Sequence, residues 1–440
     1  MKICLYNTPR NPVRGTFDKI IWCPLSGDIL NIVRFFRNSF DGRLSLHIES
    51  AFRKYFNDEN VENISFFETE GTSPVKQKRT IAFYSQSDTL ANNTFCLISE
   101  NPDYKYINYV PAGNAENSDQ FFEKKNIGYN RYSYRHLKET RPDIMVMYND
   151  WTKAAIRIIS QCHLLGIPVV CLQESIVKFG DSFRRMERSD DVMIQGIRSS
   201  VMLPRKHFYL TGNPRYSHAE DKKRTAEYVL INCNFTYSIF DEVRTRWLDD
   251  VTSALDDLGI TYVISQHPRD TGNLGRYKNV IRSSSTGMDE QMERAGLLIS
   301  RFSSLIHESL IHGVPVVYYN PHNEEMNYDF GFNPGFLAAA KEKKELKELI
   351  TQLYKKSIPG KDLESYLSEH CLPADTKPVS NINYLLSWNK FRSVNFTLTD
   401  LLHLIIYQPF LLGIFRKIRQ VLTKLLGLAD SVPGSERTLW

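Results

Sequence analysis

The chain has 440 residues, of which 42% are hydrophobic and 24% charged, and its net charge is +5 at pH 7. This length predicts two domains of about 150–200 residues each, and the composition is typical of a soluble globular protein. The mild charge and the absence of a zinc-finger or RNA-binding pattern argue against nucleic acid as a partner.

The N-terminal stretch, MKICLYNTPRNPVRG, has no apolar core of the length expected for a signal peptide. No run of about 20 apolar residues occurs, so we expect no ordinary membrane-spanning helix. The seven cysteines are irregularly spaced and include no CxxC pair. This pattern favours reduced, buried thiols in a cytoplasmic protein over disulfides or a structural zinc site.

The first half begins with KIIWCPLSGDILNIVRFFRNSF (residues 19–40), which predicts a strand, a Ser-Gly-Asp turn and a helix. Further short strands are expected at residues 81–84 and 95–99. Residues 100–135 are rich in Asn, Asp and Tyr, and we expect loops there.

From residue 141 the pattern becomes regular. RPDIMVMYND and IPVVCLQES predict two strands separated by a helix, which indicates a parallel sheet. Asp150 follows the first strand and Glu174 follows the second. Binding and catalytic residues gather at the carboxyl ends of such strands, although acids there can also simply cap a neighbouring helix.

A second strand-and-helix series starts after TGNPRYS, and we place the domain boundary within residues 212–226. Two α/β halves with a cleft between them are therefore expected. The elements expected in the second half are a strand in YVLINC, a helix at 241–258, a strand at Tyr262–Ser265, a strand near Val280, a helix at 287–295 and a strand at 296–299.

The stretch ISRFSSLIHESLIHGVPVVYYN (residues 299–320) predicts strand, helix and strand, with Ser303 and Ser304 where the helix begins. The free N–H groups of a helix start and the serine hydroxyls can bind a phosphate, and Glu308 can accept hydrogen bonds from a ribose. Alternatively, a serine here is only an N-cap and Glu308 only a favourable acid near the helix start.

Two other loops of the second half offer ligands for the same group. His267-Pro268 ends a predicted strand, where the imidazole can donate to a phosphate oxygen and Arg269 adds a cation. Asn234, in the loop NCNFTYS, can line the opposite wall. A single histidine is more often structural, so the prediction depends on the three loops acting together.

The stretch SRFSSLIHESLIHGVPVVYY resembles the serine-pair motif of CDP-glycerol glycerophosphotransferases, which have a GT-B fold. His267-Pro268 is similar to the His-Pro motif found there and in bacterial sialyl- and Kdo-transferases. The resemblance implies that His267, Ser303 and Ser304 hold donor phosphates and that Glu308 binds the ribose.

Residues 141–175, together with TGNPRYS, resemble UDP-N-acetylglucosamine 2-epimerases, and so does LSGDILNI with Asp28. The resemblance implies that Asp150 and Glu174 lie near the sugar. Several family motifs differ here, however, and the Gly-Thr-Arg-Pro-Glu loop is absent. These departures favour a transferase over an epimerase. The positions at which this sequence differs from the family motifs are Asn149-Asp150, Glu174-Ser175-Ile176 and Ser303-Ser304-Leu305.

The C-terminal stretch 398–428 predicts apolar and basic helices. On a helix over Leu411–Leu428, seven apolar residues share one face and four basic residues share the other. Such a helix can lie on an anionic membrane, pack back across both domains, or bind another protein. The apolar residues are Leu411, Ile414, Phe415, Ile418, Val421, Leu422 and Leu425, and the basic ones are Arg416, Lys417, Arg419 and Lys424.

The combined prediction is a GT-B glycosyltransferase with an acceptor-side domain (1–215), a nucleotide-donor domain (216–390) and a C-terminal helical segment (391–440). It would act at the inner face of a bacterial cytoplasmic membrane, in capsule, lipopolysaccharide or O-antigen synthesis, on a lipid-linked or oligosaccharide acceptor. The base or nucleophile is expected among Asp150, Glu174 and Asp28. No cofactor and no metal ion are expected. A sugar-nucleotide epimerase and a non-catalytic scaffold stay open as alternatives.

Overall fold

The computed structural model of the chain describes residues 1–8, 16–40, 44–57, 63–68, 79–101, 104–176, 185–218, 224–236, 239–283, 287–325, 328–373, 376–388 and 394–407. These residues form two compact units. The first unit contains the described residues up to Ser217 and those from Ser368 onward. The second contains those from His218 to Leu367.

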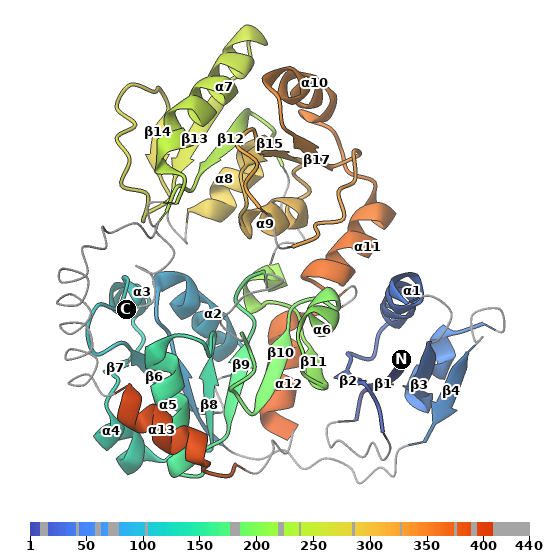
Figure 1. Cartoon of the computed structure of the whole chain (residues 1–440), viewed down its shortest axis with the longest axis vertical. Helices are drawn as coiled ribbons and strands as arrows, with labels where there is room; N and C mark the ends of the chain where they lie inside the picture. Colours follow the sequence, from blue (N-terminus) through green and yellow to red (C-terminus); the bar gives the residue numbers. More distant parts are fainter. Residues whose placement is uncertain are drawn as a thin grey trace, which may run out of the picture. The chain divides into compact units, whose positions relative to one another are not determined.

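The first unit is built on a sheet whose described strands all run parallel, in the order β4-β3-β1-β2-β11-β10-β9-β8-β5-β6-β7 (Figure 1). Parallel strands need crossover connections, which explains the helices between them. The strands are β1 (Lys2–Tyr6), β2 (Lys19–Trp22), β3 (Ser45–Glu49), β4 (Ile64–Phe67), β5 (Thr80–Tyr84), β6 (Lys105–Val110), β7 (Asn130–Arg131), β8 (Ile144–Met147), β9 (Val169–Leu172), β10 (Asp191–Ile194) and β11 (His207–Leu210).

Helices cover both faces of this sheet, so its strands are buried on both sides. In β1, Ile3 and Leu5 face one apolar cluster together with α1, whereas Cys4 and Tyr6 face another together with α2 and α12. The helices are α1 (Ile29–Ser39), η1 (Ser50–Tyr55), α2 (Asp88–Ser99), α3 (Ser118–Lys124), α4 (Tyr134–Thr140), α5 (Lys153–Leu164), α6 (Arg198–Met202), η3 (Pro214–His218), α12 (Pro378–Trp388) and α13 (Leu398–Ile406).

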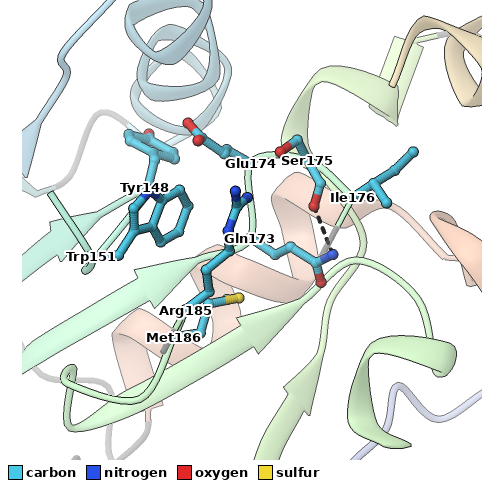
Figure 2. Close-up of a pocket in the computed structure, with 8 residues that line it drawn as sticks. All are labelled: Tyr148, Trp151, Gln173, Glu174, Ser175, Ile176, Arg185 and Met186. Atoms are coloured by element: carbon cyan, nitrogen blue, oxygen red, sulfur yellow. Dashed lines mark hydrogen bonds between the residues drawn. The ribbon is translucent and has the colours of Figure 1, made fainter. Parts of the chain in front are cut away.

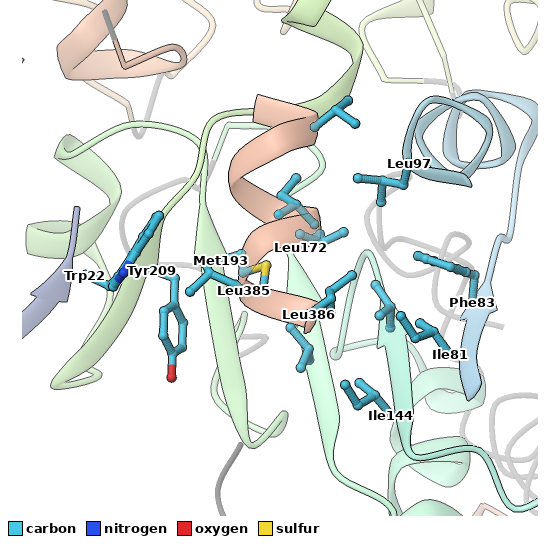
Figure 3. Close-up of a cluster of buried hydrophobic side chains, with 14 of the residues drawn as sticks. Trp22, Ile81, Phe83, Leu97, Ile144, Leu172, Met193, Tyr209, Leu385 and Leu386 are labelled. Atoms are coloured by element: carbon cyan, nitrogen blue, oxygen red, sulfur yellow. The ribbon is translucent and has the colours of Figure 1, made fainter. Parts of the chain in front are cut away.

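Helix α12 returns to the first unit after the chain has completed the second. Its side chains Val379, Ile382, Leu385 and Leu386 are at most 1% exposed and pack into the core beside β9 and β10 (Figure 3). The predicted second domain, 216–390, is therefore wrong at its C-terminal end, because the apolar face of α12 is buried in the first unit. Helix α11 (Gly360–His370) carries the chain from one unit to the other.

The second unit has a parallel sheet of the same kind, in the order β14-β13-β12-β15-β16-β17. Its strands are nearly continuous apolar runs, as expected for buried parallel strands. The elements are β12 (Tyr228–Cys233), η4 (Asp241–Val243), α7 (Arg244–Asp257), β13 (Tyr262–Gln266), β14 (Val280–Arg282), α8 (Met288–Arg294), β15 (Ala295–Ser300), α9 (Leu305–Ile311), β16 (Val316–Tyr319), β17 (Leu337–Ala340) and α10 (Lys343–Leu353).

Two sequence predictions in the first unit are wrong. Residues 95–99 belong to helix α2 and are not a strand, because Leu90, Ala91, Thr94 and Leu97 are buried at helical spacing. The region 100–135, predicted to be loops, contains β6, α3 and β7. Its tyrosines and asparagines mask the apolar pattern, although Tyr109 and Asn108 are both buried.

The C-terminal stretch is described only as far as residue 407. There α13 packs against α5 (Figure 1). The helix predicted over Leu411–Leu428 lies outside the described residues. No helix in the described ranges combines the length and hydropathy needed to cross a membrane.

Candidate functional site

The carboxyl edge of the second sheet brings three of the predicted donor-binding segments together. Strands β13, β12 and β15 are neighbours, and their parallel chains all end at this edge. His267 follows β13, Asn234 follows β12, and Ser303 lies between β15 and α9. The predicted donor-binding residues Asn234, His267 and Ser303 therefore follow adjacent strands of the sheet.

Hydrogen bonds tie these three loops to one another. The His267 backbone N–H donates to the carbonyl of Cys233 at 2.8 Å. The Asn234 side chain donates through Nδ2 to the carbonyl of Phe302 at 3.0 Å. Asn234 Oδ1 is buried and has no hydrogen-bond partner among the described residues. Asn234 thus links the β12 and β15 loops next to the serine pair.

The His267 ring is half-buried, and its Nδ1 accepts a hydrogen bond from the Arg269 backbone N–H at 3.1 Å. This contact assigns the proton of the neutral ring to Nε2, which can then donate to an anion. Pro268 and Arg269 are exposed. The loop therefore presents an oriented N–H donor and an exposed cation at the carboxyl edge of β13.

The serine pair has a partly structural role. Ser303 Oγ accepts from the Leu305 N–H at 3.2 Å, and the Ser304 carbonyl accepts from the His307 N–H at 3.0 Å. Both serines and Glu308 are half-buried. Ser303 therefore makes a local bond to the first turn of α9, whereas Ser304 occupies the N-cap position without a side-chain capping bond.

Two acidic residues that sequence reasoning did not assign to the site hold these loops in place. Asp270 is fully buried and accepts from the N–H groups of Phe235 (3.2 Å) and Gly272 (2.9 Å), and it pairs with Arg244 at 3.0 Å. It therefore joins the β12 and β13 loops. An acid two residues after His-Pro, in an otherwise apolar and basic turn, was the available signal.

Glu324 is the second of these residues, and it forms a two-bond ion pair with Arg301, at 3.1 Å to Nε and 2.7 Å to NH2. Their side chains are only 11% and 4% exposed. Arg301 also donates to the Asn234 carbonyl at 3.2 Å. Burial raises the pKa of Glu324, but the His322 ring, whose Nε2 lies 3.5 Å from the carboxylate, and the charge of Arg301 outweigh it and hold this pKa below its usual range.

A small pocket lies at the carboxyl edge of the first sheet (Figure 2). It is a shallow hollow that is partly open to solvent. Its walls come from the loops that follow β8 and β9 and from the segment before β10. The Arg185 guanidinium stacks over the Trp151 ring at 4.6 Å. The lining residues are Tyr148, Trp151, Gln173, Glu174, Ser175, Ile176, Arg185 and Met186.

Glu174 is the acid of this pocket, as the sequence had placed it after the second strand. Burial raises its pKa to about 7, Arg185 and Arg215 oppose this shift, and Glu116 adds to it. A carboxyl that is half ionised near neutral pH can accept a proton and release it again. Glu174 therefore has the electrostatic setting of a general acid or base.

Asp150 has a different setting. Its carboxylate is fully buried and accepts hydrogen bonds from the N–H groups of Met186 (2.6 Å), Arg188 (2.8 Å) and Ser189 (3.1 Å), and from the Ser189 hydroxyl (3.2 Å). Through these four hydrogen bonds the carboxylate of Asp150 holds residues 186–189 beside the pocket. The structural alternative therefore explains Asp150 better than a catalytic role.

Asp28 does not line the pocket either. It precedes α1 in the connection that follows β2, and β11 and β10 lie between β2 and β9 in the sheet. Its Oδ1 accepts from the Asn31 side chain at 3.2 Å. The structure thus separates Asp28 from Glu174, and of the three predicted acids only Glu174 lines the pocket.

No family model and no curated protein matches the sequence. Solved structures do match. MnaA of S. aureus, solved with UDP, aligns with a TM-score of 0.50 at 13% identity over 72% of this chain and 100% of its own. The UDP-GlcNAc 2-epimerase of Methanocaldococcus jannaschii, solved with UDP-GlcNAc and UDP, aligns with a TM-score of 0.50 at 15% identity. The alignment covers 70% of this chain and 99% of that structure.

At such low identity the likeness establishes the fold alone. The chain has a GT-B fold. The sequence pattern predicted two α/β halves with parallel sheets, and the structure confirms this prediction.

Proposed function

We propose that this protein is a glycosyltransferase that moves a sugar from a nucleotide-activated donor to an acceptor hydroxyl. The observation that carries the proposal is the set of three hydrogen-bonded loops at the carboxyl edge of the second sheet. They present the His267 Nε2–H and the hydroxyls of Ser303 and Ser304 from neighbouring segments. Donors of this kind suit the phosphates of a nucleotide.

The remaining predicted residues have roles in the same site. Arg269 is exposed and adds positive charge for the donor phosphates, and Pro268 shapes the turn that carries it. Glu308 is half-buried on α9 and would accept hydrogen bonds from the ribose hydroxyls. Asn234 would act mainly through the loop contact that it makes with Phe302.

In the transfer step, the acceptor oxygen forms a bond to the anomeric carbon as its proton passes to a carboxylate. The bond from the anomeric carbon to the phosphate oxygen breaks, and its electron pair leaves with the phosphate. Glu174 is the candidate base, since its raised pKa suits proton transfer near neutral pH. The His267 N–H would stabilise the charge that develops on the leaving phosphate.

The proposal includes a CMP-, CDP- or UDP-linked donor and a lipid-linked or oligosaccharide acceptor in bacterial surface-polysaccharide synthesis. The hydrogen-bond donors on the protein would take the place of a divalent cation at the phosphates, so transfer should proceed without added metal. Activity that disappears on chelation and returns with magnesium would contradict this part of the proposal.

A sugar-nucleotide 2-epimerase is the second candidate function. The fold likeness to the M. jannaschii enzyme favours it, and so does an ionisable acid, Glu174, at the carboxyl edge of the first sheet. An epimerase needs no acceptor, because it removes and replaces a proton on carbon of the bound sugar. The two candidates therefore differ in whether an acceptor is required and in whether a sugar C–H bond exchanges.

One experiment separates them. The protein is incubated in D₂O with CMP-, CDP- and UDP-linked sugars, with and without a bacterial membrane-lipid extract, and products are followed by mass spectrometry and NMR. A transferase releases nucleotide only when acceptor is present and leaves the sugar C–H bonds undeuterated. Deuterium at C2 of the sugar without acceptor would establish the epimerase instead. Neither product would contradict both enzymes and favour a scaffold.

A further inference from the structure

Helix α13 carries a continuous stripe of exposed apolar side chains. Leu398, Leu401, Leu402, Ile405 and Ile406 recur at intervals of three and four residues, so they share one face of the helix. Their relative exposures run from 44% to 72%, which is unusual for five large aliphatic residues in a row. We call these five residues the α13 stripe.

The opposite face of α13 is fastened to the first unit. Asp400 is buried and accepts from His163 Nδ1 of α5 at 2.9 Å, while His163 Nε2 contacts Asp190 at 3.3 Å. The Thr397 hydroxyl and Asp400 form a capping box at the helix start. These polar contacts set the rotation of α13 about its axis. The outward direction of the α13 stripe is therefore determined by the fold.

The charge of the sequence that follows α13 indicates what covers the α13 stripe. The sequence contains no acid between Asp400 and Asp430, and residues 408–428 contain four basic residues and many apolar ones. Burial of its ring lowers the pKa of His403, and the positive charge of Arg188 adds to this shift, while Asp400 opposes it. An apolar stripe that is followed in the sequence by a basic segment without acids is complementary to a bilayer with anionic headgroups. A soluble acidic protein would match the charge but would not require five aliphatic side chains.

We infer that the α13 stripe is a docking surface for an anionic lipid bilayer, carried by the unit that contains Glu174. A nine-residue helix is too short to cross a bilayer, so α13 would lie in the headgroup region with its apolar side chains inserted. The attachment through Asp400 and His163 would hold the first unit against the membrane surface. This inference gives the membrane association of the proposed transferase a defined structural element and does not depend on the nucleotide site.

Vesicle co-sedimentation of the full chain tests the surface. Wild-type protein should bind phosphatidylcholine vesicles that contain 30% phosphatidylglycerol and bind pure phosphatidylcholine much less. Leu401→Gln with Ile405→Gln should weaken binding to the anionic vesicles by roughly tenfold or more, since two apolar side chains can no longer insert. The matched control is Ile239→Gln with Ile281→Gln, two exposed apolar residues of the second unit, which should bind like wild type. Equal binding by the two double variants would overturn the inference.

A label on α13 tests the contact directly. All seven native cysteines are buried, so Leu402→Cys supplies an accessible thiol for an environment-sensitive fluorophore. The emission of the labelled protein should shift to shorter wavelength when anionic vesicles are added. It should stay unchanged when salt is added without vesicles. A label that already reports an apolar setting without vesicles would mean that another segment or a second copy covers α13. No shift while the protein is vesicle-bound would mean that other residues make the contact. Either result would overturn the inference.

Discussion

Replacing Glu324 by glutamine probes the ion pair that supports the candidate donor site. The glutamine keeps the shape of the side chain but leaves the Arg301 guanidinium, whose side chain is 4% exposed, without its counter-charge. Removing one partner of a buried pair costs about 3–5 kcal/mol. We therefore expect the free energy of unfolding of the second unit to fall by about 3 kcal/mol or more. The matched control is Asp257→Asn, which breaks the exposed pair with Lys347 and should cost less than about 1 kcal/mol.

Hydrogen–deuterium exchange at increasing urea concentration is the suitable assay, because peptides from β12 and β15 report on the second unit alone. Replacing both partners, Arg301→Met with Glu324→Leu, should cost less than Glu324→Gln, since no unpaired charge stays buried. If Glu324→Gln were as mild as Asp257→Asn, the argument that this pair organises the loops would be wrong.

The pH dependence of the same variant has a definite sign. The pKa of Glu324 is depressed in the folded protein, so its contribution is present above the pKa of the unfolded chain and disappears as the pH falls through the folded value. The stability difference between wild type and Glu324→Gln should therefore narrow in acid. A difference that widened as the pH fell would contradict the assigned contacts.

Two further predictions concern the first unit. Glu174→Gln should lower the transfer rate by about 10²–10⁴-fold without changing nucleotide affinity. The kcat/KM of the wild type should rise with pH through about 7 as Glu174 ionises. A flat pH profile would contradict the role of Glu174 as the base. Gly196→Ala should destabilise the first unit by about 1–3 kcal/mol, because a Cβ there would overlap the backbone of His370 where the chain returns to this unit. Gly113→Ala, whose Cβ would meet no atom within 4 Å, is the control, and equal urea midpoints for both variants would contradict the close packing.

The second unit was predictable because its signals are local. Its strands are short apolar runs bounded by polar turns, and each boundary lies where Asn234, His267 or Ser303 follows a strand. Because parallel strands share a direction, the loops that follow them meet at one edge of the sheet. The sequence could therefore indicate which residues share an edge, but not the hydrogen bonds that connect them.

The unpredicted features depend on contacts between distant residues. Nothing local to α12 shows that Leu385 and Leu386 pack beside β9 and β10, more than 170 residues earlier. The role of Asp150 likewise depends on a segment 36 to 39 residues away whose N–H groups reach it. Glu324 lies in a loop that looks solvated in sequence, yet Arg301 at the end of a buried strand requires a partner.

The claim that most needs a direct test is that the loop of His267 binds a nucleotide phosphate. Asparagine at this position can accept the Arg269 N–H through Oδ1, as Nδ1 does, but it has no donor where Nε2–H lies. Glutamine can place an N–H donor near the Nε2 position.

Isothermal titration of CMP, CDP, UDP, GDP and ADP into wild type and both variants, without metal, gives the answer. We expect one nucleotide to bind wild type, His267→Asn to bind it roughly 10- to 150-fold more weakly through loss of a charged hydrogen bond, and His267→Gln to retain part of the affinity. Unchanged affinity in His267→Asn, or no binding of any nucleotide by wild type, would contradict the proposed site.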